Sequence, residues 1–288
     1  MPPELVGILN INKPRGWTSH AAVARVRRLA QQRRVGHAGT LDPLAEGVLP
    51  ILLGRATRLT DFVQSGHKRY TATVCLGVAT TTEDAEGEVI ETRPVPPLSR
   101  EQVEAALAAF RGAIQQRPPA YSAIKVGGQR AYRVARRGDT VELAPRGVTI
   151  YALHLVDLES DRLTLDVTCS RGTYIRALAR DLAAQLGTVG HLVGLVRTQV
   201  GPFTIDSAHS LDAIAEQGVA AALLPPDAAI PDLPTFQADP SQVARLAAGQ
   251  LIAAPGLQAA HVRVYDPEGR LVCIGAADGD RLRPRIAL

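Results

Sequence analysis

The sequence predicts an α+β fold, followed by a smaller β-rich unit. Residues 68–76 alternate apolar with other side chains, which is typical of a strand, and residues 19–32 place apolar side chains on one helical face. Residues 261–286 hold three short runs with strand character. A chain of 288 residues permits one large domain and one small one, and we expect helices and strands to form an α+β body.

The first predicted elements are a strand and a helix. Residues 7–12 form a short apolar run, and residues 13–19 predict a turn in which Thr18 or Ser19 caps the helix. The helix continues to about Gln32. A basic flank near its C-terminal end suits the helix dipole and is either a solvated face or a phosphate-binding face; it consists of Arg25, Arg27, Arg28, Arg33 and Arg34.

Residues 36–47 place a single aspartate, Asp42, in a loop with several glycines. Because Pro43 follows it, Asp42 has few backbone conformations, and the glycines allow a ligand to approach closely. This pattern fits an acid that is aimed at a substrate. Taken alone, however, the loop fits better an ordinary turn in which Asp42 hydrogen-bonds its own backbone.

The strand predicted at residues 68–76 carries Tyr70 directly after two cations, with Ala72, Val74 and Leu76 on one side. A tyrosine at the start of a strand is commonly a packing residue. An aromatic ring beside basic residues is also how proteins stack an unpaired base. The sequence leaves both interpretations open.

Residues 169–186 predict the end of a strand, a turn at Gly172 and an amphipathic helix that ends at Gly187. Arg176 and Arg180 lie four residues apart, away from the apolar face. From this pattern alone Arg176 is an ordinary surface arginine.

The other predicted elements complete the two units. A helix is expected at residues 99–110 and strands at 148–158 and 163–168. Residues 213–234 contain four prolines and predict a linker. Beyond it we expect a short helix at residues 241–248 and strands at 261–265, 270–276 and 281–286.

Composition excludes some classes of protein. The chain has 32 Lys and Arg against 28 Asp and Glu, which is compatible with nucleic acid and with many other partners. Its three cysteines lie far apart and predict buried thiols rather than disulfides or a metal site. The seven histidines form no paired ligand pattern. No signal region or membrane-spanning run is present, so we expect a cytoplasmic protein.

Several of these segments together resemble the bacterial tRNA pseudouridine-55 synthases, the TruB-type family. Agreement over many segments is far more specific than any single motif, and it spans roughly the first two-thirds to three-quarters of the chain. The matching segments are residues 36–47, 68–73 and 170–176, together with 12–14, 18–19, 80–87, 119–125 and 191–203.

The resemblance implies a fold and a function. Residues 1–230 would form a pseudouridine-synthase catalytic domain, a mixed, mainly antiparallel sheet flanked by helices. Residues 231–288 are similar in position to a small PUA-like RNA-binding module. The activity implied is conversion of uridine 55 in the tRNA TΨC loop to pseudouridine, by base flipping, glycosidic bond cleavage, base rotation and carbon–carbon bond formation. No cofactor, metal, guide RNA or protein partner is expected, and we expect a monomer.

The resemblance also implies roles for individual residues. Asp42 is the catalytic carboxylate, Tyr70 stacks on the target uracil, and Arg176 is the partner of Asp42. His37 resembles the residue that helps open the tRNA loop, and Arg197 matches a position in contact with RNA. The positions that line or brace the pocket are Lys13, Asp84, Lys125, Tyr174 and Leu195.

These residue types suit the chemistry. An ionised carboxylate near the sugar acts as a nucleophile or as a base, and an adjacent arginine favours its charged form. Which atom Asp42 attacks is left open. Tyr70 can hold the ring and help remove the C5 proton, although a phenol needs assistance to act as a base near neutral pH.

Two positions depart from the family pattern. Glu46 stands where a small residue, usually threonine, is found, and it disfavours the ionised form of Asp42 if the two carboxylates face each other. Val196 replaces a second arginine and implies one RNA contact fewer.

The sequence also bears on other classes of function. A glycosidase would use two carboxylates, for which Asp42 and Asp84 are candidates, although residues 80–87 are equally typical of a solvated turn. The zinc motif of a base deaminase and the glycine-rich turn of a dinucleotide enzyme are absent from the sequence. An RNA-folding factor with an idle site, and a relative that works with guide RNA and partner proteins, remain alternatives.

Overall fold

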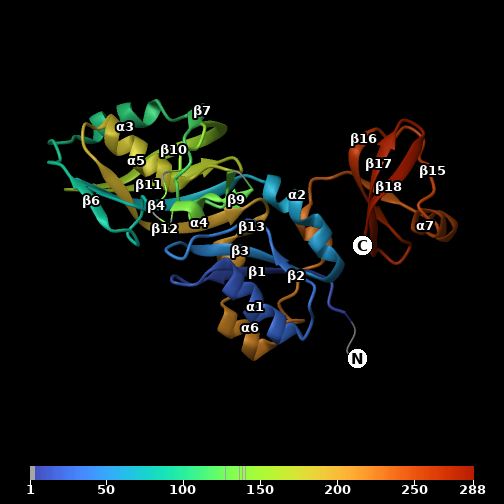
Figure 1. The fold of residues 1–288 in the computed structure, drawn as a ribbon. Helices are drawn as coiled ribbons and strands as arrows, with labels where there is room; N and C mark the ends of the chain where they lie inside the picture. The colour runs from blue at the N-terminus through green and yellow to red at the C-terminus, as the bar shows by residue number, and fades with distance from the viewer. Residues whose placement is uncertain (1–3, 127, 136, 138, 140) are drawn as a thin grey trace.

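The computed structural model describes residues 4–288 except 127, 136, 138 and 140. Figure 1 shows a large α+β body followed by a separate β-rich unit at the C-terminal end. The predicted α+β fold and its β-rich C-terminal unit are therefore confirmed.

One mixed sheet forms the centre of the body. Neighbouring strands within this sheet pair antiparallel, except for β12 and β3, which pair parallel. The prediction of a mainly antiparallel sheet is therefore correct. Short strands β2 (Val35–His37) and β13 (Phe203–Thr204) pair with β3 and β12. The order across the sheet is β1 (Gly7–Lys13), β3 (Glu46–Leu53), β12 (Gly190–Val200), β4 (Lys68–Leu76), β11 (Arg162–Cys169), β10 (Arg146–Glu159) and β7 (Gly112–Gln116).

Three helices pack on one face of this sheet, where their apolar residues join those of β1, β3, β4 and β12 in one core. They are α1 (Ser19–Ala30), α3 (Arg100–Ala108) and α5 (Ile175–Gln185). The Thr18 side chain caps α1 by accepting a hydrogen bond from the amide of Ala21, as the sequence predicts, and Gln31 ends the helix in a left-handed conformation. The hydrophobic periodicity therefore gave the correct positions for these helices.

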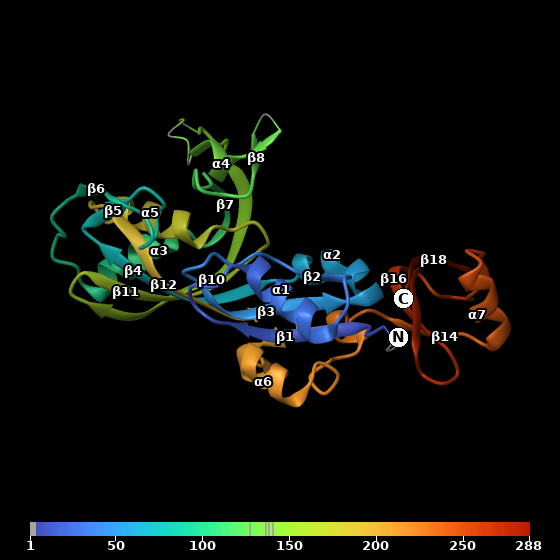
Figure 2. The same cartoon turned by 60° about the horizontal axis from the view of Figure 1, so that its bottom comes forward.

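A small insertion stands above the sheet between β7 and β10. It consists of β8 (Lys125–Val126), β9 (Gln129–Arg130) and α4 (Ala131–Ala135). Figure 2 shows it projecting from the body beside β7. A separate hairpin of β5 (Val78–Thr80) and β6 (Val89–Thr92) carries the acidic turn of residues 81–88.

The prediction of a linker at residues 213–234 is wrong. This segment begins within α6 (Leu211–Gln217) and continues through a 3-10 turn, η3 (Pro226–Ala229). Leu224 exchanges two backbone hydrogen bonds of 2.9 Å with Ile8 of β1, and Ile230 is buried in the core. The prolines prevent a long helix, but the segment packs on the body and covers the edge of β1.

The C-terminal unit contains a second sheet. Its order is β14 (Thr235–Gln237), β16 (Ala259–Tyr265), β17 (Leu271–Asp278), β18 (Arg281–Ala287) and β15 (Ile252–Ala253), with helix α7 (Pro240–Ala247) beside it. The three longer strands and the helix were predicted, whereas β14 and β15 are too short to produce a pattern. Ile274 joins a core that includes Ile8 and Val48, so this unit packs against the body through η1 (Gly54–Leu59) and α2 (Thr60–Ser65).

All three cysteines are free; Cys169 and Cys273 are buried and Cys75 is half-buried. Among the described residues, none of the helices is long and apolar enough to cross a bilayer.

Candidate active site

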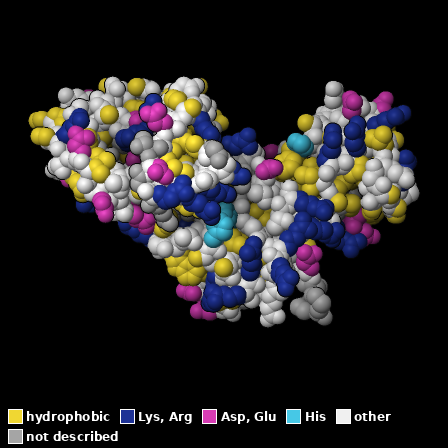
Figure 3. Space-filling model, in the orientation of Figure 1, with side chains coloured by type: hydrophobic (Ala, Val, Ile, Leu, Met, Phe, Trp, Pro, Cys, Tyr) yellow, Lys and Arg dark blue, Asp and Glu magenta, His cyan; other side chains and the backbone are white. Residues whose placement is uncertain are grey.

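A cavity of about 930 Å³ lies between the helical face of the sheet and the insertion. Its walls come from segments far apart in the sequence: the loop after β2, strands β4 and β12, the start of α5, and the β9–α4 insertion. Lys and Arg side chains gather along both sides of the concave face between the two units (Figure 3). The segments selected by the sequence pattern therefore meet around one opening.

Asp42 lies in the loop between β2 and β3, and its carboxylate reaches the cavity. The main-chain carbonyl of Asp42 accepts a hydrogen bond from the amide of Ala45, so the loop does contain a turn. The carboxylate points away from that turn and forms an ion pair of 2.9 Å with Arg176. Of the two interpretations of Asp42, the geometry favours an acid that is aimed into a pocket.

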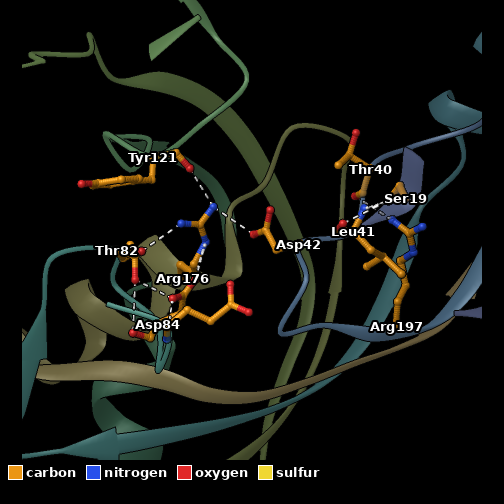
Figure 4. A network of polar contacts seen from close by, with 10 residues as sticks. Ser19, Thr40, Leu41, Asp42, Thr82, Asp84, Tyr121, Arg176 and Arg197 are labelled. Carbon is orange, nitrogen blue, oxygen red and sulfur yellow. Dashed lines mark hydrogen bonds and ion pairs between the residues drawn. The ribbon is translucent and has the colours of Figure 1, made fainter. Parts of the chain in front are cut away.

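Arg176 is the hub of the polar network (Figure 4). Its guanidinium donates to the carbonyl oxygens of Thr82 and Tyr121, both at 2.9 Å, and its Nε lies 3.5 Å from Asp84. The pairing of Arg176 with Asp42 that the resemblance implies is present. The interpretation of Arg176 as a surface arginine is wrong, because only 6% of its side chain is exposed.

Asp84 helps to hold Arg176 in place. Its carboxylate accepts hydrogen bonds from the Thr82 hydroxyl at 2.5 Å and from the amide of Glu86 at 3.1 Å, and it is buried. Residues 81–88 are thus not a solvated turn at this position. A buried carboxylate held on three sides is suited to bracing and poorly suited to serve as the second acid of a glycosidase.

Tyr70 and Leu195 lie next to each other on the sheet floor of the cavity. Tyr70 on β4 is paired in register with Arg197 on β12, and Leu195 is paired with Ala72, so the two side chains share a face. Burial raises the pKa of Tyr70, and the guanidinium of Arg197 beside it acts in the opposite direction. A neutral, buried ring here offers a flat apolar surface to a ligand.

Arg197 holds the Asp42 loop in place. Its Nε donates to the carbonyl of Val48 at 2.7 Å and one terminal nitrogen donates to that of Gly39 at 3.0 Å, and the side chain is buried. Figure 4 shows Arg197 directed toward this loop. We expected Arg197 to bind RNA; its guanidinium is instead engaged with backbone carbonyls, so the structure gives it a bracing position.

Ser19 completes the anchoring of the loop. Its hydroxyl donates to the carbonyl of Leu41 at 3.0 Å and accepts from the amide of the same residue at 2.8 Å. Sequence reasoning considered Ser19 only as a helix cap. The available signal was a polar side chain directly after the helix cap, Thr18.

His37 lies at the cavity rim with its ring edge-on to that of His20, the centroids 5.6 Å apart. Burial, together with the neighbouring His20 and Arg197, lowers the pKa of His37 to about 4. His37 is therefore neutral at physiological pH. Any contact that it makes with a ligand depends on its ring surface and hydrogen bonding rather than on charge.

Lys13 and Lys68 are buried beside the site. The ammonium of Lys13 donates to the carbonyls of Pro14 and Trp17 at 2.9 and 2.7 Å, and burial lowers its pKa to about 8. It braces the turn that packs behind Asp42. Lys68 lines the cavity itself, and burial also lowers its pKa to about 8.

Tyr174 lies at the start of α5 and lines the cavity. Its backbone is fixed by two hydrogen bonds with the side-chain amide of Gln116, at 2.8 and 3.0 Å. Lys125 is different, because it is exposed on β8 and is not part of the cavity wall as described. The role of Lys125 in lining or bracing the pocket stays a prediction.

The two departures from the family pattern lie side by side. Glu46 and Val196 are register partners on β3 and β12, and neither belongs to the cavity lining among the described residues. Sequence reasoning missed several residues that do line it: Arg130, Arg133, Arg171, His20 and Tyr121. Most lie on the insertion or in turns, where no periodic pattern marks them. In the part of the chain that the structure describes, no group of His, Cys, Asp and Glu could hold a metal ion.

Comparison with protein families gives three consecutive matches. Residues 27–175 match the TruB family pseudouridylate synthase N-terminal domain, residues 176–230 the tRNA pseudouridylate synthase B C-terminal domain, and residues 234–287 the pseudouridine synthase II TruB C-terminal domain. The chain belongs to the TruB family of pseudouridine synthases. TruB enzymes isomerise uridine to pseudouridine, and the resemblance seen in the sequence is confirmed.

Curated relatives agree with the TruB assignment. The chain is 46% identical to the tRNA pseudouridine synthase B of Thermobifida fusca over 276 residues, which is 93% of each protein. It is 41% identical to that of Caldanaerobacter subterraneus subsp. tengcongensis, over 97% of this chain and 98% of the relative. A solved H/ACA RNP bound to a substrate RNA contains a chain of the same fold, with a TM-score of 0.75 at 24% identity over 98% of this chain and 84% of that one.

Proposed function

We propose that this enzyme converts uridine 55 in the TΨC loop of tRNA to pseudouridine, and that it acts as a monomer without guide RNA, partner protein, metal or cofactor. The observation that carries the proposal is the ion pair between Asp42 and Arg176 at an open cavity. Relatives that are 41–46% identical are named tRNA pseudouridine synthase B, which supports tRNA as the substrate.

The reaction is balanced within the substrate. The bond from the sugar C1′ to N1 of uracil breaks, the base turns, and a bond from C1′ to C5 forms while the C5 proton is lost and N1 gains a proton. Atoms and oxidation state are conserved, so the chemistry calls for a nucleophile or base, a proton acceptor and a closed pocket. We assign these tasks to groups that line the cavity.

Asp42 is the group that acts near the sugar. Its carboxylate is partly exposed to the cavity, and Arg176 fixes its orientation through a short ion pair. An ionised carboxylate in this position can attack carbon or remove a proton. Arg176 in turn is immobilised by two carbonyls and by Asp84, which keeps Asp42 in one geometry.

Tyr70 and Leu195 hold the uracil while it turns. The Tyr70 ring provides a stacking surface, and its hydroxyl, assisted by Arg197, is the group best placed to accept the C5 proton. The apolar side chain of Leu195 helps to exclude water from the separated sugar and base.

The target nucleotide must leave the folded loop to reach this cavity, at a cost of a few kcal/mol in lost stacking. His37 at the rim and the cations Arg130, Arg133 and Arg171 surround the opening. We propose that His37 fills the space left by the flipped nucleotide and that the cations bind phosphates. Residues 1–230 would form the catalytic domain and residues 231–288 an RNA-binding module that extends the contact.

The experiment that tests the function uses the isolated chain and an unmodified tRNA transcript labelled with tritium at C5 of uridine. We expect release of one tritium per tRNA and a pseudouridine at position 55 alone, with no other component added. A transcript with cytidine at position 55 is the control. Failure of the wild-type chain to release tritium would contradict the proposal, and release of free uracil would indicate a glycosidase.

A further inference from the structure

Glu83 is a half-buried acid in an unusual backbone conformation, in the turn between β5 and β6. Its φ of 61° lies in the left-handed region, which is uncommon for a residue other than glycine. One carboxylate oxygen accepts a hydrogen bond from Arg180, and the other, Oε2, has no hydrogen-bond partner in the described structure. Burial raises the pKa of Glu83, with Arg180 acting in the opposite direction.

Arg180 lies one helical turn after Arg176 on α5, and the two arginines bind the same pair of segments. Arg176 contacts Thr82 and Asp84 on either side of Glu83, and it contacts Tyr121. Arg180 contacts Glu83 itself and donates to the carbonyl of residue Arg117 at 3.0 Å. The turn at residues 82–84 is thus held to α5 by three successive residues.

The same turn is fixed on its other side by β12. The carbonyl of Glu83 accepts from the amide of Leu192 at 3.1 Å, and the amide of Ala85 donates to the carbonyl of Leu192 at 2.9 Å. The Glu83 carboxylate adds a contact of its own from this turn to α5, through Arg180. Without that contact, the turn is held to α5 by the bonds of Thr82 and Asp84 to Arg176.

We propose that Glu83, clamped by Arg180, is a positioning residue that fixes the turn at residues 82–84 and thereby aims Arg176 at Asp42. This inference rests on the proposed function, because it assumes that the geometry of Arg176 and Asp42 sets the rate. A carboxylate with one buried, unpaired oxygen and a left-handed backbone both lower stability. Such features persist where the surrounding structure holds them for a geometric purpose.

Two variants remove the clamp from opposite sides. Glu83→Gly deletes the carboxylate while glycine accepts the left-handed backbone without strain, and Arg180→Gln deletes the charge on the helix. We expect each to slow single-turnover tritium release from tRNA about tenfold to a hundredfold, with unchanged tRNA affinity. The double variant should be no slower than either single variant, because each of these three proteins lacks the same interaction.

Glu104→Gln is the matched control. Glu104 also forms an ion pair with an arginine, Arg111, at 2.7 Å and accepts from the amide of Leu155, but it lies between α3 and β10, away from the cavity. We expect Glu104→Gln to release tritium at the wild-type rate, whereas loss of positioning slows Glu83→Gly and Arg180→Gln.

A wild-type rate for folded Glu83→Gly would overturn the inference. If Glu83→Gly does not fold, a wild-type rate for folded Arg180→Gln would overturn the inference instead. An active wild-type enzyme in the same assay separates this result from failure of the proposed function, which would be seen as no release by any protein.

Discussion

Arg176 and Asp42 form an ion pair whose two members differ sharply in exposure. The arginine side chain is 6% exposed, whereas the aspartate side chain is 42% exposed. The positive charge is thus fixed inside the protein and the negative charge is presented at the cavity. This arrangement keeps the carboxylate oriented while leaving it accessible to a ligand.

Arg176→Lys should slow turnover by about a hundredfold or more. A single ammonium cannot replace a planar guanidinium that contacts Thr82, Tyr121, Asp84 and Asp42 together. Single-turnover tritium release measures the rate, and a filter-binding assay should give an unchanged tRNA affinity. A rate equal to that of the wild type would show that one positive charge suffices.

Gly47→Ala should destabilise the protein by at least about 1–3 kcal/mol. Gly47 has a φ of +100°, and a Cβ atom there would lie 2.3 Å from the carbonyl oxygen of Arg197. Urea unfolding measures the change. Gly36→Ala is the control from the same stretch of chain, because a Cβ atom at Gly36 meets nothing within 4 Å. Equal stability of the two variants would contradict the close contact between β3 and β12.

His37→Asn should make the protein less sensitive to acid. Burial lowers the pKa of His37 from 6.5 to about 4, so between these values the unfolded chain binds a proton that the folded chain does not. The stability from neutral His37 is complete above pH 6.5 and is lost as the pH falls toward 4. Urea unfolding at pH 7 and pH 4.5 should show a smaller loss for the variant. If the wild type and the variant lost the same free energy of unfolding between pH 7 and pH 4.5, His37 would not be buried in the neutral form.

Tyr70→Phe should keep tRNA affinity but slow removal of the C5 proton by about 10²- to 10⁴-fold, the usual contribution of a proton-transferring group. Because burial raises the pKa of Tyr70 above its ordinary value, its basic form increases with pH throughout the neutral and alkaline range. Tritium release by the wild type should therefore rise with pH, and release by the variant should not. If the variant released tritium as fast as the wild type and with the same dependence on pH, the Tyr70 hydroxyl would be excluded as the group that accepts the C5 proton.

The regular part of the fold could be predicted because its signals are local. The helix at Ser19–Ala30 and the strand at Lys68–Leu76 each bury one side, and this burial produces the hydrophobic period seen in the sequence. Residues 213–234 gave the wrong prediction because prolines indicate only the absence of a long helix. Whether such a segment packs depends on tertiary contacts such as that of Leu224 with Ile8 of β1, far earlier in the chain.

The sequence allowed us to predict which residues form the site, but not the contacts that they make. Asp42, Tyr70 and Arg176 were selected through the resemblance and lie around one cavity. The buried state of Arg176 and the engagement of Arg197 with loop carbonyls depend on tertiary packing, which no spacing pattern records. The exposed position of Lys125 likewise follows from the path of the insertion.

The most direct test of the central claim is single-turnover tritium release by Asp42→Asn, which removes the negative charge and keeps the shape of the side chain. Glu46→Gln is the matched control, since Glu46 is an acid at the start of β3, just after the Asp42 loop, and lies outside the cavity lining as described. We predict that Asp42→Asn binds tRNA as tightly as the wild type and releases no tritium, while Glu46→Gln releases it at the wild-type rate. Tritium release by Asp42→Asn at the wild-type rate would contradict the assignment of the chemistry to Asp42.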